Sequence, residues 1–490
     1  MFFNSLDFAL FLPIVFGLYW LGTYKTHESG RFQNILIVAA SYVFYGWWDW
    51  RFLFLILLST LTDYGIGLGL SKQEHPTKRK ILLGTSILVN LLFLGFFKYY
   101  NFFIDTFMTA FSFLGMKLNP QHLHIILPVG ISFYTFQTMS YSIDVYKKKL
   151  EPTRDFIAFA AFVSFFPQLV AGPIERAANL LPQFYTKRVF DYDKAVDGCK
   201  QMLWGFFKKM VIADNCAIYA NMIFNNYQEY SGSTLVLGAL FFTFQIYGDF
   251  SGYSDIAIGS SRLFGINLMC NFATPYFSRD MAEFWRRWHI SLSTWFRDYV
   301  YIPLGGSRGG TLIAVRNTFI IFMLSGLWHG ANWTFVFWGF LNGVYFLPLL
   351  LLKKNRVHID SAAQGKLLPS GKEALSIMIT FGLTVFGWIF FRAENIGHAL
   401  RYIAGIFSPS LFSIPFFAGR IRALITILLI IGFLMVEWCG RTYPYAISKV
   451  HSRLFASNRF LRISFYSMVC TAIWFFSNSS EKLEFIYFQF

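Results

Sequence analysis

One histidine inside a long apolar stretch is the first residue whose type and setting suggest chemistry. His329 lies near the middle of the apolar stretch 311–352, between Trp328 and Gly330. An ionisable side chain inside a membrane is costly and usually functional, and imidazole is a natural general base near neutral pH. Burial disfavours the cation and would keep the ring a neutral base. The alternative is a structural histidine that binds a backbone carbonyl at a helix break; the residues favour catalysis over it.

A second histidine, His289, lies in segment 283–298, which is rich in arginine and tryptophan. On one continuous helix, His289 shares an apolar face with Trp285, Leu292 and Phe296, whereas the arginines face the other way. This pattern predicts an amphipathic helix on the cytoplasmic surface of a membrane. A purely structural interpretation is a membrane-surface helix whose arginines reach lipid phosphates. The functional interpretation adds that His289 faces a reaction chamber.

Further polar side chains are candidates for binding a substrate or an acyl donor. Arginines can hold an anionic group by paired hydrogen bonds, although lipid headgroups are alternative partners. An acid- and hydroxyl-rich motif can either line a polar cavity or cap a turn. Trp328 and Asn332 flank His329 in the chain. These binding candidates are Arg286, Arg287, Arg297, Arg308, Trp328, Asn332, Asp249, Tyr253 and Asp255.

The sequence predicts no metal and no bound cofactor. The pair His122 and His124 has no third ligand nearby, as a metal site would need. The cysteines are scattered without a close pair, so we expect small buried apolar residues and not a disulfide or zinc site. They are Cys199, Cys216, Cys270, Cys439 and Cys470.

The composition indicates that these candidate residues lie in a membrane protein. The chain has 490 residues, of which 55% are hydrophobic and 14% charged, whereas soluble domains carry about 25% charged residues. This excludes a disordered protein, a nucleic-acid-binding arm and an ordinary cytosolic enzyme. The formal charge of +16 comes from basic residues in short loops between apolar runs. An anionic acyl donor or anionic lipid would explain that surplus equally well.

Apolar segments predict about ten to thirteen membrane elements, some of them re-entrant, in an all-α polytopic protein. We expect one integral-membrane domain over residues 1–490, with a helical hairpin in 311–352 whose irregular apex is 325–332. Basic loops place the N-terminus outside the cytoplasm, and the first span is expected to be retained. The segments are 6–24, 32–48, 52–70, 81–100, 156–171, 233–248, 375–391, 421–438 and 463–478, with less apolar ones at 122–146 and 195–213.

Five motifs in order resemble the membrane-bound O-acyltransferase (MBOAT) family, and most of all its alginate O-acetylase membrane-subunit branch. They are 167–174 (PQLVAGPI), 249–259 (DFSGYSDIAIG), 284–306 (FWRRWHISLSTWFRDYVYIPLGG), 325–333 (SGLWHGANW) and the terminal 484–490 (EFIYFQF); the opening 8–14 (FALFLPI) is also similar. The resemblance implies an MBOAT-like helical body around a tunnel reached from both leaflets. It also implies that His329 is the catalytic histidine, that His289 is the second polar position, and that the arginines of 284–308 lie on the side of the acyl donor.

The resemblance further implies transfer of an acyl group, by expectation acetyl from acetyl-coenzyme A, across a bacterial inner membrane. The acceptor would be a hydroxyl of an exported polysaccharide or of an extracytoplasmic acetyltransferase partner. His329 would take the hydroxyl proton, and His289 would orient the donor or stabilise the oxyanion. Alternatives are D-alanyl transfer toward teichoic acid, a proton-coupled transporter, and a scaffold of a secretion complex. No nucleic acid partner is expected.

Overall fold

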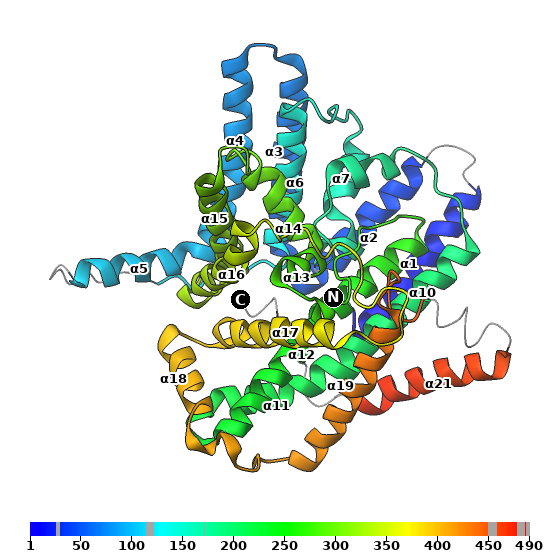
Figure 1. The fold of residues 1–490 in the computed structure, drawn as a ribbon. Coiled ribbons are helices and arrows are strands. Elements are labelled where there is room, and N and C mark those ends of the chain that lie inside the picture. Colours follow the sequence, from blue (N-terminus) through cyan, green and yellow to red (C-terminus); the bar gives the residue numbers. More distant parts are fainter. Residues whose placement is uncertain (26–29, 114–121, 171, 449–457, 478–485, 487–490) are drawn as a thin grey trace. The chain divides into compact units, whose positions relative to one another are not determined.

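The computed structural model describes residues 1–25, 30–113, 122–170, 172–448, 458–477 and 486, and every regular element among them is helical (Figure 1). The all-α polytopic fold predicted from the sequence is therefore confirmed. The described helices fall into two compact units, which we treat separately: unit 1 comprises Met1–Val196 with Ser260–Met269, and unit 2 comprises Asp197–Gly259 with Cys270–Phe490. A single domain over 1–490 stays a prediction.

A buried carboxylate joins three helices of unit 1. Asp63 of α3 accepts hydrogen bonds from Ser86 (2.5 Å) and Asn90 (2.8 Å) of α4 and from Ser142 (2.6 Å) of α6. A buried polar group is tolerated when it is hydrogen-bonded in this way. The helices of this unit are α1 (Leu6–Lys25), α2 (Arg31–Asp49), η1 (Trp50–Phe52), α3 (Leu53–Lys72), α4 (Pro76–Leu94), η2 (Gly95–Tyr99), α5 (Tyr100–Phe113), α6 (Ile131–Tyr146), α7 (Phe156–Ser164), α8 (Phe166–Leu169), α9 (Ala177–Leu180) and η3 (Leu181–Phe184).

Unit 2 carries both candidate histidines. Its helices include α10, which begins in unit 1, and α12, whose last turn belongs to unit 1. They are α10 (Tyr192–Phe206), η4 (Phe207–Ala213), α11 (Asp214–Asn225), η5 (Tyr227–Glu229), α12 (Gly232–Leu263), η6 (Pro275–Phe277), α13 (Met281–Arg287), α14 (Ile290–Phe296), η7 (Arg297–Tyr301), α15 (Thr311–His329), α16 (Trp333–Leu351), α17 (Gly371–Arg392), α18 (Ile396–Ile406), η8 (Pro409–Phe412), α19 (Arg420–Gly440) and α21 (Arg459–Phe476).

Eight helical stretches among the described residues are long and apolar enough to cross a membrane, which makes this a multi-pass membrane protein. The second stretch contains two of the predicted segments, 32–48 and 52–70. They form α2 and α3, which are separated at Asp49, where the backbone is extended (φ −158°, ψ 110°). The stretches are Leu6–Tyr24, Arg31–Lys72, Pro76–Ser112, Gly232–Leu263, Thr311–His329, Trp333–Leu351, Gly371–Arg392 and Arg420–Gly440.

The predicted span 156–171 is wrong as a span. Its described part forms two short helices, α7 and α8, which meet at Phe165 and together are too short to cross a bilayer. Pro167 lacks the N–H that a continuing helix would need. Side chains such as Phe159 and Phe162 are fully buried, so the segment is a core element of unit 1. Its strong hydrophobicity reflects burial in protein and not contact with lipid.

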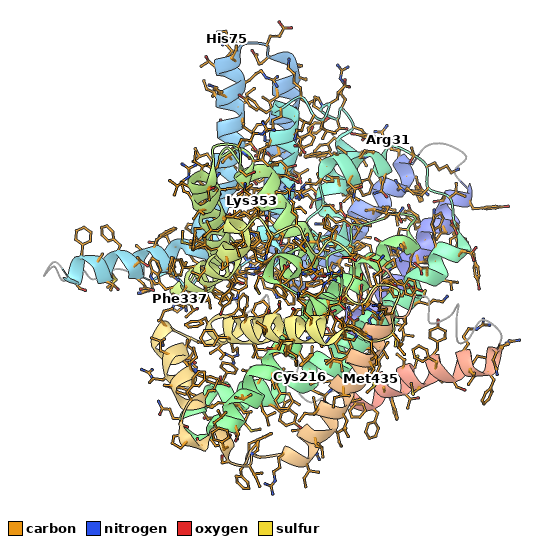
Figure 2. The ribbon with its side chains drawn as sticks, in the orientation of Figure 1. Arg31, His75, Cys216, Phe337, Lys353 and Met435 are labelled. Carbon is orange, nitrogen blue, oxygen red and sulfur yellow. The ribbon has the colours of Figure 1, made fainter. Side chains whose placement is uncertain are left out.

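The expectation that the cysteines are buried holds for only one of them. Cys216 of α11, labelled in Figure 2, is fully buried, whereas the other four are exposed. Cys439 lies on α19, which is one of the eight candidate spans. A membrane protein leaves apolar side chains exposed toward lipid, so a small apolar residue need not lie in its core.

The predicted hairpin is confirmed as α15 and α16, which pack along each other. Their close approach depends on two glycines. A β-carbon on Gly326 would lie 2.1 Å from the Phe335 carbonyl oxygen, and one on Gly339 would lie 2.3 Å from that of Phe322. Small residues commonly permit such helix contacts in membranes. The irregular apex is shorter than predicted, since 325–329 stay helical and only 330–332 leave the helix.

Candidate active site

His329 is the last residue of α15, and only 2% of it is exposed. The residues after it set this position. A β-carbon on Gly330 would clash with the Phe335 ring at 2.1 Å, so the chain turns here on a glycine. Asn332 then caps α16, because its Oδ1 accepts a hydrogen bond from the Thr334 N–H at 3.0 Å. The motif at 325–333 therefore builds a tight apex that ends α15 at the histidine.

His289 lies at a helix break, which corrects the prediction of one continuous helix. The segment forms α13 and α14, and between them His289 adopts φ +43° and ψ +54°. This left-handed conformation is uncommon outside glycine and is often found at functional sites. His289, Trp288 and Trp295 are buried, with at most 5% exposed. Trp288 and Trp295 therefore do not lie at an aqueous surface. Helix α13 packs against α16 of the hairpin.

Asn271 supplies hydrogen-bond acceptors for the first turn of α14. Its backbone carbonyl accepts the Ile290 N–H at 3.0 Å, and its side-chain Oδ1 accepts the Ser291 N–H at 3.2 Å. These are two of the first N–H groups of α14, which otherwise have no intrahelical acceptor. The Asn271 amide nitrogen donates to Ser254 at 3.1 Å. Asn271 could not be identified from the sequence, since an asparagine in a loop carries no signal of this role.

The same amide determines the tautomer of His289. A backbone N–H can only donate, so the Asn271 atom that receives Ser291 N–H is the oxygen. His289 Nδ1 lies 3.2 Å from that oxygen and must therefore carry the proton. Burial lowers the pKa of the His289 imidazole to about 3, so the ring is neutral near pH 7. Its Nε2 then carries a lone pair and can accept a hydrogen bond.

The structure brings the two histidines together inside unit 2. Their ring centroids are 6.2 Å apart, and the ring planes meet at 61° in an edge-to-face arrangement. Trp328 contacts both rings, at 5.7 Å from His289 and 5.1 Å from His329. Trp338 and Phe391, each at 5.3 Å, complete the wall around His329. The tunnel implied by the resemblance stays a prediction.

A cluster of buried tryptophans adjoins this wall, and none of its members was among the site residues predicted from the sequence. Trp388 stacks on Trp338 at 5.4 Å and contacts Trp288 at 5.0 Å. The indole N–H groups of Trp285, Trp288 and Trp388 are buried and have no acceptor among the described residues. An unmet buried donor is costly, and each such case needs an explanation. These three indoles could donate hydrogen bonds to a substrate oxygen.

The four candidate arginines do not gather around the histidines. Arg286 donates to the carbonyls of Asn355 (2.8 Å) and His358 (2.5 Å). Arg287 pairs with Glu283 (3.0 Å) and also donates to carbonyl oxygens. Both arginines therefore tie the loop 353–360 to α13.

The other two arginines lie elsewhere on the same unit. Arg297 forms an exposed ion pair with Asp298 at 2.7 Å. Arg308 is exposed and precedes α15. At 1.5 Å per residue, about 27 Å of helix separates that end of α15 from His329.

Asp249, Tyr253 and Asp255 lie on the continuous helix α12, so the capped-turn alternative is wrong. They meet two buried lysines that the sequence analysis did not pair with them. Lys209 binds Asp249 and Asp214, both at 2.8 Å, and Lys208 binds Asp255 at 2.5 Å. Burial raises the pKa of Asp214 to about 6, although Lys209 opposes that shift.

This ionic cluster also binds one residue of the terminal motif. Of residues 484–490 only Ile486 is described, and its N–H donates to Asp249 at 2.7 Å. The cluster approaches His289 through Phe250, whose ring lies 4.6 Å from the imidazole. Among the described residues, no three histidine, cysteine or carboxylate side chains group as a metal site would require.

Comparison with known proteins shows which proteins this chain resembles. Residues 42–391, which include both histidines, match the model of the membrane-bound O-acyltransferase family. A protein of Pseudomonas aeruginosa named as a probable alginate O-acetylase, AlgI, is 44% identical over 81% of this chain and 73% of its own. A peptidoglycan O-acetyltransferase of Helicobacter pylori is 36% identical over 81% and 77%. A teichoic acid D-alanyltransferase of Bacillus subtilis is 28% identical over 57% and 72%.

Proposed function

Because this chain belongs to the membrane-bound O-acyltransferase family, we propose that it is an O-acetyltransferase that acts across a bacterial inner membrane. The acyl donor is acetyl-coenzyme A at the cytoplasmic side. The acceptor is a hydroxyl of an exported polysaccharide or of an extracytoplasmic acetyltransferase partner. The names of the alginate and peptidoglycan relatives support acetyl transfer to such polymers. With an O-acyltransferase family established, the transporter alternative falls away.

One observation carries the proposal: two buried histidines lie with their ring centroids 6.2 Å apart in a wall of aromatic rings. His329 acts as the general base. It takes the proton of the acceptor hydroxyl while that oxygen bonds to the thioester carbonyl carbon. The carbon–sulfur bond then breaks, the proton passes from His329 to the departing thiolate, and the ester and free thiol leave. General base action of this kind contributes a factor of about 10²–10⁴.

His289 acts as a hydrogen-bond acceptor in this scheme. Its Nδ1 proton is engaged by Asn271, and the low pKa of the buried ring opposes a second proton. A neutral Nε2 can orient a donor or acceptor group that presents a hydrogen, but it cannot donate to an oxyanion. Of the two roles expected from the sequence, orientation therefore has the better support.

The oxyanion needs donors, and the buried indoles supply them. Trp288 adjoins His289 in the chain, and Trp388 contacts both Trp288 and the Phe391 ring beside His329. A preorganised N–H in a dry site stabilises developing charge more than it would in water. We assign these two indoles as candidate oxyanion donors.

The decisive experiment replaces His329 with glutamine and measures thiol release from acetyl-coenzyme A and polymer acetylation. We expect turnover to fall by about 10²–10⁴. His398→Gln is the matched control, since His398 is also buried, at 5% exposure, and lies on α18 of the same unit. Membrane abundance is measured for both. Full turnover in a correctly inserted His329→Gln protein would remove the catalytic assignment.

D-alanyl transfer remains a second candidate, because teichoic acid D-alanyltransferases are 28–29% identical over 57–59% of this chain. The two functions differ in their donor. In the D-alanyl scheme implied by the resemblance, a carrier protein presents the acyl group. Turnover of acetyl-coenzyme A by the purified chain without any carrier would oppose it, and turnover only with a D-alanyl carrier would replace acetyl transfer.

A further inference from the structure

Unit 1 contains a pocket of about 440 Å³ that the acyl-transfer chemistry does not use. It lies between the end of α1, the segment 186–194 and the turn after α12. Trp20 forms part of its wall and donates to the Leu263 carbonyl at 3.0 Å. This volume is within the usual range for small-ligand sites. The pocket is therefore large enough for a headgroup-sized molecule.

The wall of this pocket is cationic. Four basic side chains line it against one acid, and that acid, Asp191, is paired with Lys194 at 3.4 Å. The basic residues are Lys187, Arg188, Lys194 and Arg262. Basic pockets between membrane helices are typical sites for anionic headgroups.

Arg188 gives independent evidence that an anion belongs here. Only 5% of it is exposed, and it is held in place by Tyr19 and Asn34, both at 2.8 Å. These partners are neutral. No carboxylate among the described residues lies within ion-pair distance of Arg188, and its Nη2 has no acceptor among them. A buried charge without a counter-ion is costly, and an anion in the pocket would offset that charge.

The surroundings place the pocket at a membrane boundary. Two candidate spans, Leu6–Tyr24 and Gly232–Leu263, end beside it. Val189 and Phe190, which also line it, are 77% and 45% exposed. At the edge of a bilayer, lipid tails contact exposed apolar side chains, and lipid phosphates contact neighbouring cations. The exposed apolar and basic side chains of this pocket fit that environment.

We propose that this pocket binds the phosphate group of an anionic ligand, either a phospholipid headgroup or a soluble phosphoester. Recognition comes from the cations of 186–194 and Arg262, and Trp20 packs against the rest of the headgroup. The proposal does not depend on the acyl-transfer reaction, since none of these residues belongs to the histidine site.

The test uses the full chain, purified in phosphate-free detergent solution, with native mass spectrometry of two added probes. Dioleoylphosphatidylglycerol represents the lipid source, and glycerol 3-phosphate represents the soluble source. The variant Lys187→Gln/Lys194→Gln removes two exposed cations from the wall. Thr186→Trp fills the pocket without changing its charge. The matched control Lys78→Gln/Lys80→Gln removes two exposed cations at the start of α4.

We expect phosphatidylglycerol affinity to fall roughly 30-fold in the double variant, because each such cation contributes about 1 kcal/mol and 1.4 kcal/mol is tenfold. Thr186→Trp should also lose this binding, and the control should keep it. Binding of glycerol 3-phosphate alone, lost in the same variants, would assign the site to a soluble phosphoester. Equal binding of both probes by the wild type, the variants and the control would overturn the proposal.

Discussion

Replacing Asn271 tests the geometry of the histidine pair most directly. Its side-chain oxygen lies 3.2 Å from His289 Nδ1 and accepts from Ser291 N (3.2 Å) and Ser291 Oγ (2.9 Å). Asn271→Asp keeps an acceptor for all three groups and adds a negative charge. An adjacent opposite charge raises a histidine pKa by about 1–3 units. The pKa of His289, lowered by burial to about 3, should therefore rise to roughly 4–6.

Asn271→Ala has a different effect because it removes the acceptor. Three buried donors, His289 Nδ1–H, Ser291 N–H and Ser291 Oγ–H, lose this acceptor, at a cost of about 1–3 kcal/mol each. The His289 tautomer that carries its proton on Nδ1 also loses one stabilising hydrogen bond, worth about 1 kcal/mol. Turnover should therefore fall roughly fivefold or more. Ser254→Ala is the control, since it removes only the partner of the Asn271 amide nitrogen.

The assay is thiol release from acetyl-coenzyme A by the chain in lipid nanodiscs between pH 5 and pH 8.5. Asn271→Asp should keep most of its turnover at pH 8 and lose it on the acid side, as His289 takes up a proton. Asn271→Ala should be slower at every pH, with an unshifted profile. If a folded Asn271→Asp protein shows the wild-type pH profile, or merely copies the alanine variant, Asn271 does not control His289.

Three further predictions concern other parts of unit 2. The pKa of His289 is about 3 in the folded chain against an ordinary 6.5, so the unfolded chain binds more protons between these values. The stability contributed by the neutral ring is then fully present above pH 6.5 and falls as the pH drops toward 3. The melting temperature of His289→Gln should therefore depend less on pH between pH 7 and pH 5 than that of the wild type. An unchanged pH dependence would refute this. Gly326→Ala should destabilise the α15–α16 hairpin by about 1–3 kcal/mol, because the added β-carbon would meet a carbonyl oxygen. Thermal unfolding in detergent measures this loss. Gly382→Ala is the control, because its β-carbon would meet nothing within 4 Å. Trp388→Phe keeps an aromatic ring but removes an N–H donor, so kcat should fall about 10²-fold or more with little change in KM, and an unaltered kcat would exclude the indole as an oxyanion donor.

The composition and periodicity of the chain were sufficient for the class of fold. Long apolar stretches must form helices in lipid, because each backbone polar group has to be satisfied within its own segment. The hairpin of 311–352 follows from the same rule. Hydrophobicity alone could not separate contact with lipid from burial in protein, and the core segment 156–169 was therefore taken for a span.

The site divides in the same way. His329 and His289 could be selected from the sequence because an ionisable ring among apolar residues is costly and needs a reason. A periodicity argument placed His289 on one continuous helix, whereas a left-handed residue at 289 breaks it. That conformation has no local signal, since the stabilising groups come from Asn271, eighteen residues away in the chain.

The sequence by itself thus determined that the protein is a helical membrane protein and marked two imidazoles as candidates, because burial cost and hydrophobic length are properties of residue types. Tertiary structure decided the distance between the rings, the proton position on His289, the indoles beside them and the lysines that neutralise the acids of α12. Hydrogen-bond direction and charge pairing are relations between atoms on different elements, and only folding brings those atoms within reach of each other.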